Sequence, residues 1–280
     1  MCEVITFSTD GLWVKTEEAW INSEGATIYG EIYIPDVVPA PAVLICHGMD
    51  TQGFHFLKIY TQLAKAACRN GFVSLVFDFR GVGKSTGKFD YGFAEQQDVK
   101  CALNYLALRK EVLANKCFIV GHSLGGAVSL YAVQNERRVK GLVLWATPKN
   151  HTYNMKKFVR RTRGRLGFYL FLVFSWIDKL FDVSKFFKME VYGINLRLKY
   201  VREKLMKLNE YEAVSNLRDI PLLILVGDED VIVDVPEARQ VFLAANEPKD
   251  FLIIRGADHI YNGKEDELIA QTIEWLKKWE

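Results

Sequence analysis

The strongest constraint on the fold is a regular alternation between short apolar runs and helical patterns. The apolar runs are continuous, which is typical of strands buried on both faces. They cover residues 42–46, 72–77, 116–120, 139–145, 221–226 and 250–254. Apolar residues at helical spacing occupy residues 56–70, 93–110, 235–245 and 265–279. This order predicts a mostly parallel central sheet with helices on both faces, preceded by antiparallel strands up to about residue 35.

One segment interrupts this alternation. Between Pro148 and Pro221 there is no buried-strand pattern, only helical, basic and aromatic sequence. Its sixteen lysines and arginines stand against seven acids, a net charge of +9. The whole chain carries +2, so the rest of it is near −7. We therefore predict one α/β core, residues 1–147 and 221–280, with an inserted helical cap at 148–220.

A glycine-rich turn follows the third apolar run. The run ends at Gly121, Ser123 comes two residues later, and Gly125 precedes another helical pattern. Gly121-x-Ser123-x-Gly125 has the form of a nucleophile elbow, in which the flanking glycines avoid collisions between Cβ atoms and neighbouring backbone. The N-terminus of the next helix then stabilises developing negative charge. Ser123 is the candidate nucleophile, although a G-x-S-x-G pattern also arises by chance.

A serine nucleophile needs a base, and the base needs an orienting acid. In open parallel sheets the functional residues lie at the carboxyl ends of strands. The run 221–226 is followed by Asp230, and the run 250–254 is followed by His259. The chain order Ser123, Asp230, His259 is the order expected for a nucleophile elbow of this kind. We predict His259 as general base and Asp230 as orienting acid.

Other acids and histidines are assigned structural roles. Asp228 directly follows the strand, before the loop can turn back toward the histidine. Asp234 is expected to cap the following helix. His47 and His122 flank glycines in tight turns, where packing or turn stabilisation is the expected role. His151 is expected to be solvated or in contact with the cap.

The oxyanion hole is expected to consist of two backbone N–H groups. One belongs to Leu124, directly after the nucleophile. The other is expected from the loop after the first core strand, where Met49 is the best candidate. Because only backbone atoms are used, these two side chains are free to line an acyl pocket.

The cap carries an apolar stretch, residues 166–177, beside a basic run, residues 156–165. A helix that is apolar nearly all round must be buried against something. Packing over Ser123 predicts an aromatic pocket, for which Phe54, Phe168 and Trp176 are the predicted substrate-binding residues. The alternative is weak contact with a membrane surface, to which the basic flank would contribute.

Five separated motifs together resemble the α/β-hydrolase fold across essentially the whole chain. They are His47-Gly48, Asp78-x-Arg80-Gly81-x-Gly83-x-Ser85, the elbow, Gly227-x-x-Asp230 and Asp258-His259. Residues 77–89 and 256–259 look most like the small cinnamoyl/feruloyl esterases, and the cap is also similar to monoacylglycerol lipases. The resemblance implies a cap-bearing carboxylesterase without a cofactor. It also implies triad roles for Ser123, Asp230 and His259, and oxyanion roles for Met49 and Leu124.

Composition narrows the remaining possibilities. The five cysteines are scattered without a C-x-x-C pair, which argues against a disulfide framework or a metal site and suits a reducing compartment, so we expect a cytoplasmic protein. No secretory signal is recognised, and the longest apolar stretch is too short for a membrane span. A net charge of +2 gives no reason to expect nucleic acid as a partner. The oligomeric state is left open.

The sequence predicts a serine carboxylic-ester hydrolase acting on apolar or aromatic acyl esters, with a small-molecule ester as its partner. Two alternatives remain open at this stage. One is a monoacylglycerol lipase or thioesterase acting at a lipid surface. The other is a non-catalytic binding module built on a hydrolase fold.

Overall fold

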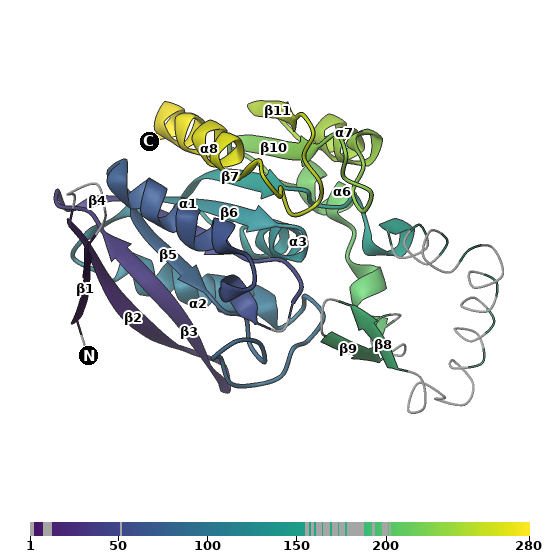
Figure 1. The fold of residues 1–280 in the computed structure, drawn as a ribbon, viewed down its shortest axis with the longest axis horizontal. Helices are drawn as coiled ribbons and strands as arrows, with labels where there is room; N and C mark the ends of the chain where they lie inside the picture. The colour runs from purple at the N-terminus through teal and green to yellow at the C-terminus, as the bar shows by residue number, and fades with distance from the viewer. Residues whose placement is uncertain are drawn as a thin grey trace.

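A computed structural model describes most of the chain outside the insertion. The described residues are 3–7, 13–50, 52–154, 188–191, 194–197 and 203–280, with residues 157, 160, 164, 169, 173, 177 and 201. Nine strands form one sheet in the order β1-β2-β3-β5-β4-β6-β7-β10-β11 (Figure 1). Their bounds are β1 Glu3–Phe7, β2 Trp13–Ser23, β3 Ala26–Ile34, β4 Ala40–Cys46, β5 Val73–Phe77, β6 Val112–His122, β7 Val139–Trp145, β10 Leu222–Gly227 and β11 Lys249–Ile254.

Strand direction divides this sheet into two parts. On one side of the sheet, β1 pairs with β2, β2 with β3 and β3 with β5, and all three pairs are antiparallel. From β5 onward, every neighbouring pair through β4, β6, β7, β10 and β11 is parallel. The predicted parallel core with an antiparallel N-terminal part is therefore confirmed. The carboxyl ends of the parallel strands meet at one edge, where ligand sites of such sheets are found.

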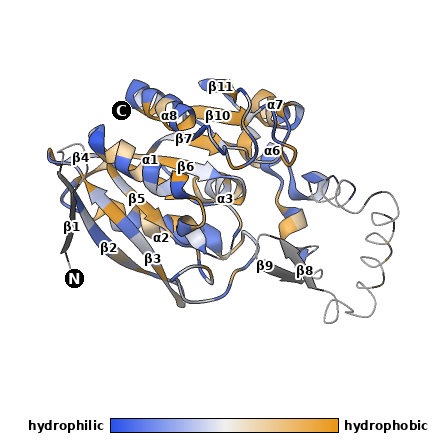
Figure 2. Ribbon diagram, viewed as in Figure 1, coloured by the Kyte–Doolittle hydropathy of each residue, from blue (hydrophilic) through white to orange (hydrophobic). Residues whose placement is uncertain are grey.

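Helices cover both faces of the sheet because alternate residues of each strand point to opposite sides. In β4, Val43 and Ile45 join one buried cluster with α1 (Lys58–Arg69) and α8 (Glu265–Trp279). Leu44 and Cys46 join the other cluster, which includes residues of α2, α3, α6 and α7. These helices are α2 Glu95–Ala107, α3 Leu124–Ala132, α6 Glu210–Ser215 and α7 Val235–Ala244. Figure 2 shows the hydrophobic residues gathered on the central strands.

The insertion is not purely helical. Strands β8 (Lys188–Val191) and β9 (Ile194–Arg197) form a separate antiparallel pair, away from the main sheet (Figure 1). The expectation of a helical cap is wrong at this point. The missed signal is local, because β-branched Val191 and Ile194 flank a Tyr-Gly pair, and a glycine-containing two-residue separation is typical of a hairpin.

The C-terminal part of the insertion packs into the core itself. Val201, Leu205 and Val214 are fully buried in the cluster that also holds α2 and α3. Lys204 pairs with Asp90 of the core. This part of the predicted cap is therefore continuous with the core in its packing. Among the described residues, no helix is both long and apolar enough to cross a membrane.

Candidate active site

Ser123 lies in a strained turn between β6 and α3. Its backbone has φ 51° and ψ −116°, a conformation that few non-glycine residues adopt. A Cβ at Gly121 would lie 2.6 Å from the Cα of Gly126, and one at Gly125 would lie 2.3 Å from the carbonyl oxygen of Cys46. Both glycines are thus required for the close approach of strand and helix. The structure has the turn geometry that the sequence pattern predicts.

Asp230 and His259 lie beside Ser123 at the carboxyl edge of the sheet. The Nε2 atom of His259 is 3.2 Å from the Oγ of Ser123, and its Nδ1 is 2.8 Å from Asp230 Oδ2. The other oxygen of Asp230 accepts the backbone N–H groups of Ile232 and Val233 at 2.8 and 2.9 Å. Asp230 and His259 are both buried. A carboxylate held by two amides presents its remaining oxygen to the imidazole in a fixed direction.

The neighbouring acids have other partners. Asp228 accepts the backbone N–H of Gly256 at 2.6 Å. Asp234 is the N-cap of α7 and accepts the backbone N–H of Glu237 at 3.0 Å, as predicted. The structure therefore brings Asp230, rather than either neighbour, to His259.

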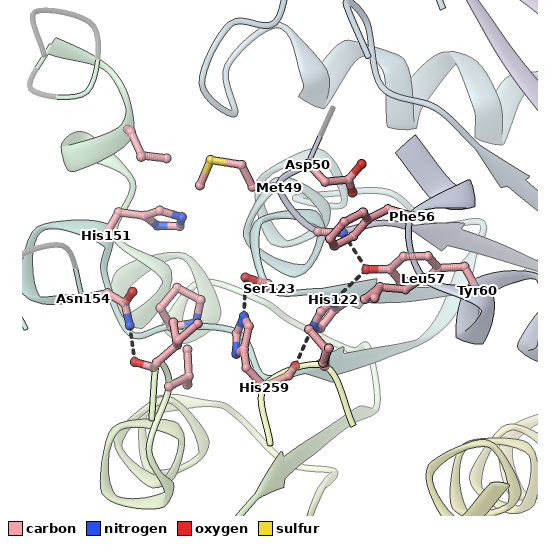
Figure 3. A pocket seen from close by; sticks show the side chains of 16 residues that line it. Met49, Asp50, Phe56, Leu57, Tyr60, His122, Ser123, His151, Asn154 and His259 are labelled. Atoms are coloured by element: carbon pink, nitrogen blue, oxygen red, sulfur yellow. Dashed lines mark hydrogen bonds between the residues drawn. The ribbon is translucent and has the colours of Figure 1, made fainter. Parts of the chain in front are cut away.

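The two predicted oxyanion donors are Met49, in the loop after β4, and Leu124, directly after Ser123. Met49 follows β4 and lines the same cavity as Ser123 (Figure 3). Leu124 begins α3, and its side chain is buried in the core. The expectation that this side chain is free to line an acyl pocket is therefore wrong, because it packs in the core and does not line the cavity. That the backbone N–H groups of Met49 and Leu124 bind an oxyanion stays a prediction.

A buried hydrogen-bond chain that the sequence did not predict links the loop before Met49 to His259. The hydroxyl oxygen of Tyr60 accepts the N–H of Gly48 at 3.0 Å. Tyr60 donates to Nδ1 of His122 at 2.6 Å, and Nε2 of His122 donates to the carbonyl oxygen of His259 at 2.9 Å (Figure 3). This direction follows because a carbonyl can only accept, which places the single proton of neutral His122 on Nε2. Burial, with a smaller contribution from His259, lowers the pKa of His122 to about 3.

Replacing Tyr60 with phenylalanine tests this chain. The ring stays, but the buried N–H of Gly48 and Nδ1 of His122 lose their partner. The free energy of unfolding is expected to fall by about 1–3 kcal/mol, as for an unsatisfied buried polar group. The turnover number is expected to fall more than KM changes, because the chain positions the oxyanion loop and His259. Urea unfolding and steady-state kinetics measure the two effects, and a variant that is indistinguishable in both would contradict the role.

His122 also predicts a pH dependence of stability. In the unfolded chain its pKa returns to about 6.5, while burial holds the folded value at about 3. Between these values only the unfolded chain binds the proton, so the free energy of unfolding falls as the pH is lowered through this window. The contribution approaches about 1.4 kcal/mol per pH unit. Urea unfolding at pH 7 and pH 5 measures this change in the free energy of unfolding. The change is expected to be smaller in His122→Gln than in the parent, and equal changes would sink the prediction.

A cavity lies above Ser123 and His259, with about 780 Å³ of empty space that includes open solvent. Most of its wall is apolar. The apolar side chains that the sequence did not predict are Phe56, Leu57, Pro148, Leu205, Ile232, Val233 and Ile260. Besides Ser123, the polar residues that line it are Asp50, Tyr60, His122, His151, Asn154 and His259. No group of three or more metal-ligating side chains occurs in the described part of the chain.

The predicted substrate-binding residues need a correction. Phe54 is fully buried and stacks on Tyr29 with ring centroids 6.0 Å apart, so it packs against the sheet instead of lining the cavity. The short 3-10 turn at Gly53–His55 directs Phe54 inward, and Phe56 lines the cavity in its place. Phe168 and Trp176 lie outside the described residues.

The chain is similar to enzymes of several activities. It is 22% identical to a polyketide transferase from Stachybotrys chlorohalonatus, over 91% of this chain and 94% of that one. It is 25% identical to a monoglyceride lipase from Saccharomyces cerevisiae, over 85% and 83% of the two chains. The crystal structure of a hypothetical protein from Pseudomonas aeruginosa has the same fold, with a TM-score of 0.75 and 18% identity over 95% and 94%.

The family model described as "Serine aminopeptidase, S33" matches residues 38–264. This range runs from the start of the parallel sheet to the loop after His259, and so spans the elbow and both of its partners. The chain therefore belongs to this family of α/β serine hydrolases.

Proposed function

We propose that the protein is a serine carboxylic-ester hydrolase with Ser123, His259 and Asp230 as its catalytic triad. The observation that carries the proposal is the contact of His259 with both partners, at 3.2 Å to Ser123 and 2.8 Å to Asp230. Nε2 of His259 takes the proton of Ser123 as Oγ attacks the ester carbonyl carbon. Asp230 keeps the other ring proton on Nδ1 and stabilises the imidazolium that forms.

The remaining steps follow from the same groups. The backbone N–H groups of Met49 and Leu124 bind the oxyanion of the tetrahedral intermediate. When the intermediate collapses, His259 gives its proton to the leaving alcohol, and the acyl group stays on Ser123. Water then loses a proton to His259 and attacks the acyl carbon. When this second intermediate collapses, His259 gives the proton to Oγ of Ser123 and the acid is released.

The apolar cavity supports esters with an apolar or aromatic acyl group, such as cinnamoyl and feruloyl esters. Phe56, Leu57 and Ile260 line it and would bury such a group by the hydrophobic effect. This substrate class agrees with the resemblance of residues 77–89 and 256–259 to cinnamoyl/feruloyl esterases.

A second candidate is a monoglyceride lipase or thioesterase acting at a lipid surface. The yeast relative is a monoglyceride lipase. In addition, the insertion exposes two large apolar side chains one helical turn apart, Tyr169 at 64% and Val173 at 52%. An exposed apolar helix face beside basic residues is typical of contact with a membrane surface.

A substrate panel separates these proposals. Methyl ferulate, glycerol monoesters and acyl thioesters of increasing chain length are assayed with and without anionic lipid vesicles. An optimum at aryl or short acyl groups without activation by vesicles supports the esterase, while activation by vesicles with long-chain glycerol esters supports the lipase. Labelling by an organophosphate that is lost in Ser123→Ala distinguishes either enzyme from a non-catalytic binding module.

A further inference from the structure

A second histidine–carboxylate pair faces the cavity, apart from the one that contacts Ser123. Nδ1 of His151 lies 2.8 Å from Oε1 of Glu210. Glu210 is fully buried, and His151 is 8% exposed. Within the described residues, neither the Glu210 carboxylate nor Nδ1 of His151 has a hydrogen bond of regular geometry, and His151 alone forms an ion pair with Glu210. An ionised carboxylate can only accept hydrogen bonds and needs a compensating charge when it is buried, so Nδ1 is the nitrogen of His151 that would carry a proton toward Glu210.

The other ring nitrogen of His151, Nε2, is then available to hydrogen-bond a molecule in the cavity. Figure 3 shows the ring reaching into the cavity from the side opposite Tyr60 and His122. With its first proton held toward Glu210, Nε2 is a donor when the ring is charged and an acceptor when it is neutral. The pair therefore presents one polar atom in a wall that is otherwise largely apolar.

Asn154 lies one helical turn from His151 and also lines the cavity. Its amide nitrogen donates to the carbonyl oxygen of Ile232 at 2.6 Å, which fixes the orientation of the amide group. The amide oxygen is left on the side toward His151 (Figure 3). This oxygen can only accept a hydrogen bond.

The segment that carries these two side chains is held at several points. Thr152 donates to the carbonyl oxygen of Met206 at 2.8 Å. The N–H of Tyr211, next to Glu210, donates to the carbonyl oxygen of Lys149 at 2.9 Å. Such fixed contacts position His151 and Asn154 before a substrate enters, which reduces the entropy lost on binding.

We propose that His151 and Asn154 form a subsite for a hydroxyl group of the substrate, so that the preferred esters carry a hydroxyl on their acyl or alcohol part. A hydroxyl has one proton to donate and lone pairs that accept. When the ring of His151 is charged, the hydroxyl accepts the Nε2–H and donates to the Asn154 oxygen, and when the ring is neutral its single proton goes to one of these two acceptors. A carboxylate fits less well, because it would face the Asn154 oxygen and the charge of Glu210. Moreover, no lysine or arginine is among the described residues lining the cavity. The subsite rests on the proposed ester hydrolysis at Ser123.

The test compares esters in which a methyl group replaces a hydroxyl. The acyl pair is the p-nitrophenyl esters of β-hydroxybutyrate and isovalerate, and the alcohol pair is glycol monobutyrate and propyl butyrate. The parent enzyme is expected to favour the hydroxyl ester of one pair by about tenfold or more in kcat/KM, the effect of a hydrogen bond to a charged group. The pair that responds identifies the part of the ester that faces the cap. In His151→Leu and Asn154→Ala the ratio is expected to fall toward one.

Tyr153→Phe is the matched control. Tyr153 lies between the two subsite residues but is 43% exposed and does not line the cavity, so its ratio is expected to equal that of the parent. A parent ratio near one, or in favour of the methyl ester, in both pairs overturns the subsite while Ser123-dependent hydrolysis leaves the proposed function standing. This ratio is measured on the parent enzyme, so it does not depend on whether the variants fold. Absence of hydrolysis of every ester, with no labelling of Ser123, overturns both.

Discussion

Replacing Ser123 with alanine is expected to lower kcat by about 10³-fold or more and to leave the fold intact. The change removes Oγ of Ser123, the oxygen that Nε2 of His259 contacts, while alanine keeps the Cβ of the elbow. The oxyanion donors and the cavity remain, so KM is expected to change much less than kcat. Hydrolysis of a p-nitrophenyl ester measures the effect, and circular dichroism checks the fold.

Ser129→Ala serves as the control for this variant. Ser129 lies on α3, the helix that begins directly after Ser123, is fully buried and donates to the carbonyl oxygen of Gly125 at 2.7 Å. Its loss affects helix packing but removes no group from the cavity. Ester hydrolysis that persists in Ser123→Ala at the rate of Ser129→Ala would refute the assignment of the nucleophile.

Replacing Asp230 with asparagine is expected to lower kcat by about 10²–10⁴-fold, in line with the loss of the orienting acid in serine hydrolases. One oxygen of Asp230 is already bound by the N–H groups of Ile232 and Val233. Asparagine keeps its single oxygen there and turns its NH₂ group toward Nδ1 of His259. That arrangement favours the proton on Nε2, and the ring can then no longer accept the proton of Ser123.

Asp228→Asn distinguishes this effect from a general loss of negative charge. Asp228 lies on the same loop and accepts only the N–H of Gly256 among the described contacts, so its amide variant is expected to retain most of the activity. Steady-state kinetics on both variants, with thermal unfolding as a check on stability, provide the comparison. Equal losses in the two variants would mean that Asp230 acts through charge alone.

Local patterns in the sequence predicted the sheet and the positions of the functional residues along it. The apolar runs became the buried parallel strands, because residues such as Val43 and Leu44 point to opposite faces and both faces are covered. The glycines around Ser123 predicted the turn because only small residues allow the backbone contacts seen at Gly121 and Gly125. Asp230 was preferred over Asp228 by its place in the loop, and the structure brings it to His259.

The pocket was predicted less well, because its lining depends on how loops and helices turn in space. Phe54 and Phe56 are two residues apart, yet one packs in the core and the other faces the cavity. No local pattern separates them, since both are aromatic residues before the same helix. The 3-10 turn at Gly53–His55 decides the direction of each side chain.

By itself the sequence determined what depends on neighbouring residues: the strands, the elbow at Ser123 and the order of its partners. Tertiary structure alone decided what depends on residues far apart in the chain. His151 and Glu210 meet across the insertion, and Tyr60 of α1 reaches His122 at the end of β6. A buried polar group takes whatever partner the fold brings within hydrogen-bond distance, because an unpaired one is costly. The spacing of residues along the chain does not encode that choice.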